Sequence, residues 1–326
     1  MKNPARRFSS LAAGTALAVA SLGAAAQSAY PCPTVKLVSP YPPGGTTDML
    51  ARLIQQGLGK ELGTTVIVEN KAGASSNIGT EYVAAAAPDG CTLLLGNNTG
   101  VAINRNLYKL RIDPVKGLAP VGAVASVPLV LYVNAGLPAN SLSQLVDLAK
   151  KNPGKFSYAS GGSGSPQHLM GELLKLEQNI DLAHIPYKGQ GPAMQDVVSG
   201  QVQMAFETTS VIVPQLASGR VRALATTGVV RPKSLPNVPT MKELGMPDFV
   251  TENWYGVFAP ARTPPALVQR LNGALNAVLD SKDVRASLEK MGSAEVKGTP
   301  ESFAKFIAKE LPLWESVVKR SGAKVD

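Results

Sequence analysis

The chain has 326 residues, of which 44% are hydrophobic and 17% charged, and its 32 Lys and Arg against 23 Asp and Glu give a formal net charge of +9. This composition is too apolar and too weakly charged for a disordered chain, and the length suffices for one large domain or two ordinary ones. With two cysteines and two histidines there is little material for a Cys/His metal site, so we expect no metal and no cofactor.

Residues 1–26 are predicted to form a secretory signal peptide. Three early basic residues, Lys2, Arg6 and Arg7, precede an uncharged apolar run, and the alanines at 24–26 are the small residues that signal peptidase requires. The run is shorter than the roughly 18 apolar residues of a membrane-spanning helix. We therefore expect export to the periplasm, with the signal peptide removed.

The two cysteines, Cys32 and Cys91, are predicted to form a disulfide in that oxidising compartment. Each precedes an apolar, strand-like run, and the starting ends of neighbouring parallel strands are adjacent in a sheet. A redox pair would require a Cys-x-x-Cys spacing, which is absent. Two free, buried thiols remain the other alternative.

Strands and helices alternate along the rest of the chain. The predicted strands lie at 35–38, 65–68, 93–95, 129–133, 156–159, 183–186, 202–206, 221–225 and 254–258. The predicted helices cover 49–58, a segment ending at 82–87, and then 142–150, 166–177, 192–198, 267–279 and 303–314. This order is typical of an α/β fold in which mostly parallel sheets are flanked by helices.

Two such α/β series without a flexible linker predict two lobes. We place the first lobe at 27–127 together with 251–326, since the C-terminal helices are expected to pack back on it, and the second at 128–250. Ligands of such sheets bind at the carboxyl ends of strands and at helix N-termini, so we expect a ligand cleft between the lobes.

A glycine-rich segment at 41–48 connects the first strand to the first helix. Gly44 and Gly45 allow backbone N–H groups to turn inward, and the helix start adds the positive end of a dipole, so the segment could cradle an anion. As an ordinary turn, the same segment would only cap the helix, with Thr46 or Thr47 as N-cap. The residues alone support both interpretations equally.

A second Gly/Ser segment, 160–165, also follows a strand and opens a helix, with Ser165 placed as N-cap and Pro166 as the first helical residue. Two such loops, one per lobe, would face each other, and each could take one carboxylate of a ligand. Polar residues also end the strands at 96–100 and 206–210. Apolar walls could come from three aromatic residues, for which a core position is the more usual one: Tyr41, Trp254 and Tyr255.

Motifs of the common enzyme classes are absent, so we expect no catalysis. The segment 161–165 ends in Ser where G-x-S-x-G requires Gly, and there is no G-x-G-x-x-G, Walker A or His-Glu-x-x-His sequence. His168 and His184 are expected to be structural. A secreted serine hydrolase using Ser163 or Ser165 with His168 remains an alternative, although no residue that would orient the base is evident. No basic stripe with interleaved aromatics indicates nucleic acid.

Eight segments resemble those of a known family, in the same order. They are YPPGGTTD (41–48), APDG (87–90), AIN (102–104), IPYKG (185–189), SGQV (199–202), RALA (222–225), VPT (238–240) and WYGVFAP (254–260). Together they resemble the Bug-type periplasmic receptors, the extracytoplasmic substrate-binding proteins of tripartite tricarboxylate transporters. The resemblance spans essentially the whole chain after the signal peptide. It implies a two-lobed, type II-like periplasmic binding protein that closes on a carboxylate, partly through ordered water.

The resemblance also implies a set of ligand-binding residues, with one carboxylate on each Gly-rich loop. The candidates are Tyr41, Gly44, Gly45, Thr46, Asp48, Asn98, Thr99, Ser160, Gly162, Ser163, Ser165 and Glu207. Glu207 stands where the family commonly has Asp, Thr208 where Asn is usual, and Val101 where His is frequent. These departures lie near the expected site, so the resemblance does not determine which carboxylate binds.

Neither Gly-rich loop contains Lys or Arg, so we expect backbone amides, hydroxyls, helix dipoles and bridging water to hold the anion. Asp48 is expected to hold the loop or a water, and Gly45 to adopt a positive φ. The expected ligand is an organic mono- or dicarboxylate, with aromatic carboxylates included. The expected partners are the membrane subunits of a transporter, and the receptor itself is expected to be a monomer. A receptor that serves signalling without transport is the alternative.

Overall fold

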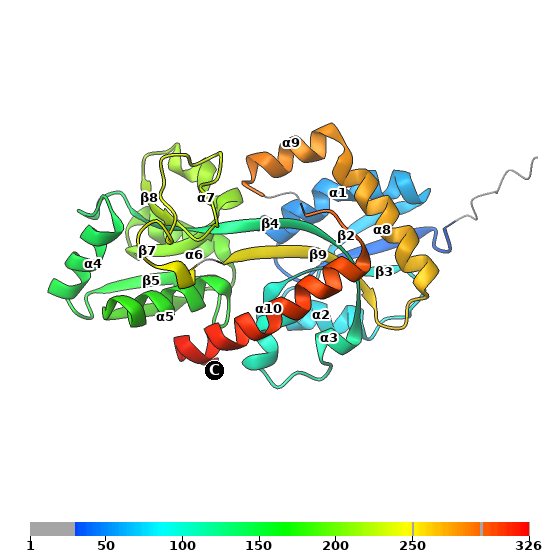
Figure 1. Cartoon of the computed structure of the whole chain (residues 1–326), viewed down its shortest axis with the longest axis horizontal. Coiled ribbons are helices and arrows are strands. Elements are labelled where there is room, and N and C mark those ends of the chain that lie inside the picture. Colours follow the sequence, from blue (N-terminus) through cyan, green and yellow to red (C-terminus); the bar gives the residue numbers. More distant parts are fainter. Residues whose placement is uncertain (1–29, 250, 294–295, 326) are drawn as a thin grey trace, which may run out of the picture.

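The computed structural model describes residues 30–249, 251–293 and 296–325, so the predicted signal peptide at 1–26 lies outside the described residues. Two groups of strands and helices form the two ends of an elongated molecule (Figure 1). Two long strands, β4 (Leu118–Asn134) and β9 (Glu252–Pro260), run between these groups.

The first lobe contains the N-terminal α/β series and the end of the chain. Its elements are β1 (Thr34–Ser39), α1 (Thr46–Leu62), β2 (Thr65–Asn70), α2 (Asn77–Ala84), β3 (Thr92–Asn97), a π-helix (Thr99–Ile103), α3 (Pro114–Gly117), β9, α8 (Pro265–Asp280), α9 (Lys282–Lys290) and α10 (Pro300–Ser321). The strand order is β2-β1-β3-β9-β4. The first three strands are parallel, as predicted, whereas β9 pairs antiparallel with both β3 and β4.

The second lobe repeats this arrangement. Its elements are α4 (Leu142–Lys151), β5 (Phe156–Ser160), α5 (Pro166–Gln178), β6 (Leu182–Pro186), α6 (Gln190–Ser199), β7 (Met204–Thr208), α7 (Thr209–Leu216) and β8 (Val221–Thr226). Strand β5 pairs in parallel with β6 and β7, and β4 pairs antiparallel with β7 and β8. The sheets of both lobes are therefore mixed, and the antiparallel pairs come from the shared strand β4 and from β9.

Strand β4 belongs to both sheets. Its first part, 118–128, pairs with β9, and its second part, 129–134, pairs with β7 and β8. The change of partner falls between Pro128 and Leu129. Because the second part is apolar and rich in β-branched residues, it is buried on both faces in the second lobe.

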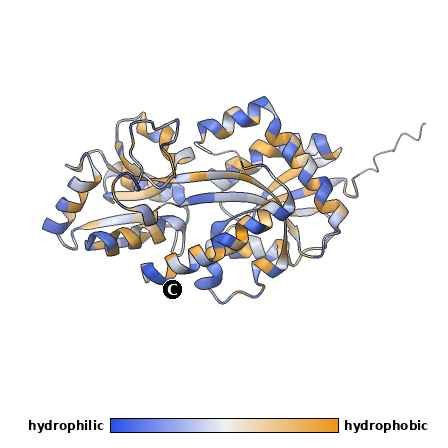
Figure 2. Ribbon diagram, viewed as in Figure 1, coloured by the Kyte–Doolittle hydropathy of each residue, from blue (hydrophilic) through white to orange (hydrophobic). Residues whose placement is uncertain are grey.

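Hydrophobic residues gather on the strands and on the inward faces of the helices, as Figure 2 shows. Helix α8 packs on α1, as expected for the first lobe. The last helix, α10, is expected to belong to the first lobe alone, but it also contacts α5 of the second lobe, where Arg320 bonds to Glu177. None of the helices at 30–249, 251–293 and 296–325 combines the length and the apolar character of a membrane span.

The predicted disulfide is confirmed. Cys32 and Cys91 are bonded, with their Cα atoms 5.6 Å apart and a sequence separation of 59. Cys32 precedes β1 and Cys91 precedes β3, and these two strands are parallel neighbours, so their starting ends meet at one edge of the sheet.

Candidate functional site

A cavity of about 230 Å³ lies between the two lobes, at the carboxyl ends of β1, β3 and β7. Its walls are 41–47, Ser75, Asn97, Thr99, Gly161, 165–167, 188–192, 207–208, Val211, Asn253 and Tyr255. Seven of the predicted ligand-binding residues are among them: Tyr41, Gly44, Gly45, Thr46, Thr99, Ser165 and Glu207. The two Gly-rich loops therefore border one cavity.

Four helices begin at this cavity, namely α1 at Thr46, α5 at Pro166, α6 at Gln190 and α7, whose N-cap Thr208 is part of the wall. The first N–H groups of a helix have no partner within it, and the dipole adds positive potential there, so these ends favour a negatively charged group. The sequence places the starts of α1 and α5 at the ligand site, predicts the third helix at 192–198 without placing its start there, and does not predict α7. The signal for the third was the segment 188–192, in which glycines precede Pro192.

Asp48 does not line the cavity but holds the first loop. Its carboxylate accepts hydrogen bonds from the Gly44 N–H at 3.1 Å, from Arg52 Nε at 3.0 Å and from Asn70 Nδ2 at 2.9 Å. Burial raises the pKa of Asp48, but the hydrogen bonds from Arg52, Asn70 and Gly44 outweigh it, so the pKa lies below its ordinary value. The carboxylate is therefore ionised and already bonded to protein donors.

The positive φ expected at Gly45 is found at Gly44 instead. Gly44 has φ +92°, whereas Gly45, the N-cap of α1, has an extended backbone with φ −86°. An added Cβ at either glycine would meet no heavy atom within 4 Å, so backbone conformation alone separates the two positions. The loop therefore requires glycine at position 44, because a residue with a side chain rarely adopts this positive φ.

In the second loop, Ser160, Gly162 and Ser163 stand outside the cavity walls. Ser160 Oγ lies 2.7 Å from His184 Nε2 and 3.1 Å from the Gly162 carbonyl oxygen, and the Ser163 carbonyl accepts from Tyr108 Oη at 3.2 Å. These three residues shape the loop from behind. Gly161 and Ser165 of the same loop line the cavity.

The two histidines stack behind this loop, His168 buried and His184 partly buried. Their ring centroids are 4.0 Å apart, and His168 Nδ1 accepts the Gly164 N–H at 3.0 Å. Burial lowers the pKa of both imidazoles, that of His184 to about 3. Ser165 Oγ caps α5 by accepting the His168 N–H, and among the described residues no carboxylate bonds either ring. The arrangement lacks the oriented base that a serine hydrolase requires.

Alternation along the strands decides which neighbouring residues face the cleft. Asn97 lines the cavity beside Tyr41, whereas Asn98 turns away and donates to Asn253 Oδ1 at 3.2 Å. Tyr255 also lines the cavity. Trp254, expected as a wall, points instead to the opposite face of β9, where it packs on Phe303 and donates to Glu310.

Glu207 is buried at the end of β7, with 2% of its surface exposed, and it lines the cavity. Its Oε1 accepts from the Thr208 N–H at 2.7 Å and from Thr208 Oγ1 at 3.0 Å. Burial raises the pKa of Glu207 to about 7, although hydrogen bonds from Thr208 and Gln167 oppose the rise. The cleft thus contains a carboxyl group that titrates near neutrality.

Direct hydrogen bonds join the lobes beside the cavity. Thr46 Oγ1 of the first lobe lies 2.8 Å from both Thr208 Oγ1 and Ser210 Oγ of the second. Thr209 Oγ1 donates to the Met291 carbonyl oxygen at 2.6 Å. Sequence reasoning missed Thr208 and Ser210 as partners of Thr46, because 162 and 164 residues separate them from it.

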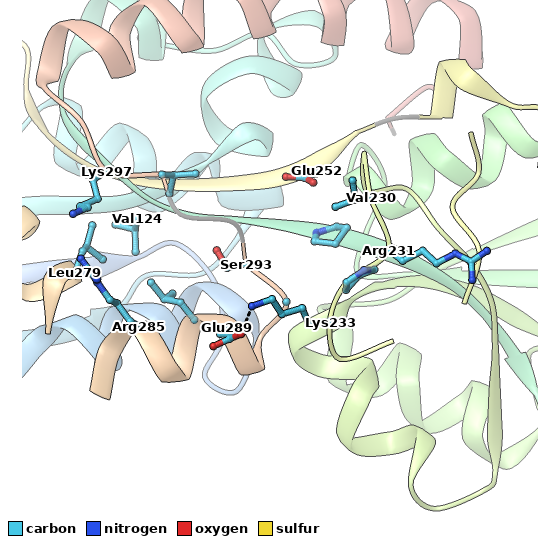
Figure 3. Close-up of a pocket in the computed structure, with 15 residues that line it drawn as sticks. Val124, Val230, Arg231, Lys233, Glu252, Leu279, Arg285, Glu289, Ser293 and Lys297 are labelled. Atoms are coloured by element: carbon cyan, nitrogen blue, oxygen red, sulfur yellow. Dashed lines mark hydrogen bonds and ion pairs between the residues drawn. The ribbon is translucent and has the colours of Figure 1, made fainter. Parts of the chain in front are cut away.

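A larger cavity of about 360 Å³ lies between the lobes, among β4, β9, α9 and the segment 230–233 (Figure 3). It shares no lining residue with the cleft cavity. Its walls are largely apolar, and Lys233 and Glu289, which point toward each other in Figure 3, form an ion pair at 2.7 Å across the lobes. No helix of the described chain begins in its walls, so it lacks the anion-attracting ends of the cleft cavity.

Comparison with known proteins matches residues 50–323 to the tripartite tricarboxylate transporter family receptor. The chain belongs to this family. Protein BugT of Bordetella pertussis is 39% identical over 298 residues, which cover 91% of each chain. The resemblance noted from sequence is therefore confirmed, and the chain is a solute-binding receptor of the tripartite tricarboxylate transporter family rather than an enzyme.

Solved structures of other family receptors share its fold. The periplasmic binding protein BugD is 35% identical, with a TM-score of 0.85 over 91% of this chain and 100% of its own. A Rhodopseudomonas palustris protein solved with adipate is 34% identical, with a TM-score of 0.87 over 91% and 100% of the two chains. MatC from the same species, solved with bound malate, is 34% identical, with a TM-score of 0.83 over 89% and 100%.

Proposed function

We propose that this receptor captures a small organic mono- or dicarboxylate in the cleft cavity and passes it to the membrane subunits of a tripartite tricarboxylate transporter. The observation that carries the proposal is the convergence of four helix N-termini on one interlobe cavity of about 230 Å³. The adipate and malate seen in two relatives support the ligand class. Candidate ligand contacts are Tyr41, Gly44, Gly45, Thr46, Thr99, Ser165 and Glu207.

Calorimetric titration of unfolded and refolded protein, freed of co-purified ligand, tests this proposal. Adipate, malate and benzoate are the probes, and adipamide, which has the length of adipate without its charge, is the matched control. At 100 times its dissociation constant, the cognate ligand should stabilise the fold by about 2.7 kcal/mol. The assignment would be refuted if adipamide bound as tightly as every carboxylate, or if no carboxylate bound at all.

Recognition by backbone amides and hydroxyls is part of the same proposal. One cation, the exposed Lys188, stands at the cavity wall, in the IPYKG segment (185–189) and outside both Gly-rich loops. We expect Lys188→Gln to weaken carboxylate binding less than tenfold, because an exposed charge pair contributes roughly 0–1 kcal/mol. If Lys188→Gln abolishes binding, a salt bridge holds the anion and the amide mechanism is wrong.

The proposed setting is the periplasm, after removal of residues 1–26, with the chain monomeric and divided into lobes at 27–127 with 251–326 and at 128–250. The change of partner within β4 between Pro128 and Leu129 supports that division. The mass of the exported protein and light scattering after gel filtration check the cleavage and the oligomeric state.

A further inference from the structure

We propose that Glu207 enters the ligand complex as the protonated acid and donates a hydrogen bond from Oε2 to a carboxylate of the ligand. Capture of the anion then takes up a proton whenever Glu207 of the free receptor is ionised. This inference rests on the proposed function and narrows it: the ligand group opposite Glu207 is a hydrogen-bond acceptor, not an ammonium.

The position of the two carboxyl oxygens carries the first step. Glu207 Oε1 accepts from both the N–H and the hydroxyl of Thr208, at 2.7 and 3.0 Å, so this oxygen has the role of an acceptor. A proton on the carboxyl group therefore belongs on Oε2, and the side chain of Gln167, which lines the same cavity, also bonds to this carboxyl group. A protonated Glu207 thus adds an O–H donor to a cavity whose helix starts supply N–H donors.

The surroundings of Glu207 contain no counter-ion. In the described part of the chain it forms no ion pair, and the tyrosines that face it, Tyr132 of β4 and Tyr255 of β9, have pKa values raised by their own burial and also by its charge. The cavity's Lys188 is exposed to solvent. A buried carboxylate without a cation favours its neutral form, and the pKa of about 7 agrees with this environment.

The other elements packed against β7 direct their ionisable groups elsewhere. Tyr158 of β5 donates to Glu172 of α5, which also pairs with Lys175, and His168 of α5 stacks on His184. Asp196 of α6 accepts from Tyr187, and α7 has no ionisable side chain. None of these groups is therefore in place to keep Glu207 ionised.

The anion-attracting helix ends decide between the two possible ligand groups. A ligand ammonium at Glu207 would lie beside the positive ends of α1 and α5. A ligand carboxylate at the same place is stabilised by these ends and in turn stabilises the protonated form of Glu207. The geometry therefore favours a protonated acid that meets an anion.

Calorimetry of the unaltered receptor with adipate and malate, from pH 6.5 to 8.5 in phosphate and in Tris, measures proton uptake directly. Uptake should rise toward one proton per ligand as pH increases. With a free-receptor pKa of about 7 for Glu207, the apparent Kd at pH 8.5 should be about 30-fold weaker than for the fully protonated form. A flat Kd with no proton uptake would overturn the inference.

The variant Glu207→Gln keeps the shape and a donor but cannot ionise, so its Kd should be independent of pH and tighter than the parent's at pH 8.5 by about tenfold or more. The matched control is Glu310→Gln. Glu310 is a partly buried carboxyl group whose pKa is also raised, bonded to Trp254 and Trp314 outside the cavity, and its variant should keep the parent's profile.

Two results would distinguish failure of this inference from failure of the proposed function. In the first, the unaltered receptor binds a carboxylate tightly, and the folded variant Glu207→Gln does not bind it at any pH. An ionised Glu207 then contacts a cationic ligand group, so the inference is wrong while the proposed function stands. If no carboxylate binds the unaltered receptor at any pH, the proposed function falls and this inference with it.

Discussion

The hydroxyl of Thr46 offers a direct test of how lobe closure contributes to affinity. Thr46→Val keeps the shape of the side chain and removes the two interlobe contacts at 2.8 Å, to Thr208 and Ser210, which remain 3.1 Å from each other. At about 1 kcal/mol net for each hydrogen bond, the closed form loses about 2 kcal/mol, which corresponds to a Kd about 25-fold weaker. Thr46→Ser retains the hydroxyl and is the matched control.

Calorimetry with the best carboxylate measures the change in Kd, and small-angle scattering measures the radius of gyration without ligand. We expect Thr46→Val to have the larger radius and Thr46→Ser to resemble the parent, because the lobes close less often without the two bonds. If Thr46→Val binds within twofold of the parent and has the same radius, these bonds do not hold the lobes together and the reasoning is wrong.

Three further predictions concern the loop, the disulfide and the stacked histidines. Gly44→Ala should weaken carboxylate binding in calorimetry more than Gly45→Ala, because only Gly44 has a positive φ; equal effects would contradict this. Replacing Cys32 and Cys91 by Ala opens a loop with a sequence separation of 59. From the loss of chain entropy alone, this should lower the free energy of unfolding in urea by about 4 kcal/mol. An unchanged unfolding midpoint would refute the prediction. The pKa of His184 in the folded protein lies near 3, below its value of about 6.5 in the unfolded chain, so the unfolded state binds more protons as pH falls from 6.5 toward 3 and stability is lost in that window. His184→Gln should therefore lose less stability between pH 7 and 5 in urea unfolding, and an equal loss would exclude this histidine as the cause.

Most of the fold follows from alternating apolar runs and turn residues, but several elements do not, among them α3, α7, α9 and the first half of β4. Helix α9 is strongly polar and buries only Val284 and Leu288, and two apolar positions in nine residues are too few to predict a helix. The first half of β4, 118–128, contains Pro120, Gly122 and several alanines, which have low strand propensity, and the bulges between Pro120 and Gly122 and between Ala123 and Ala125 interrupt its pairing with β9. Pairing with neighbours remote in sequence determines these last two elements.

The location of the site could be predicted more completely than its chemistry. The loops at 41–48 and 160–165 indicated helix starts that do border the cavity. Which residue of a pair such as Asn97 and Asn98 faces the ligand depends on how each strand ends, which a loop motif does not specify. The burial of Glu207 also depends on the packing of both lobes, and its raised pKa could not be read from its neighbours in sequence.

The shared strand β4 has a mechanical consequence. A paired ribbon of β4 and β9 bends more easily across its face than within its plane, so we expect the lobes to move along a single coordinate, an opening angle about the point near Pro128 where β4 changes partner. Distances between spin labels, one on each lobe, would then change together along that coordinate and not vary independently. Ligands of different length would then hold the lobes at different opening angles, and a membrane subunit in contact with both lobes would distinguish these ligands by that angle.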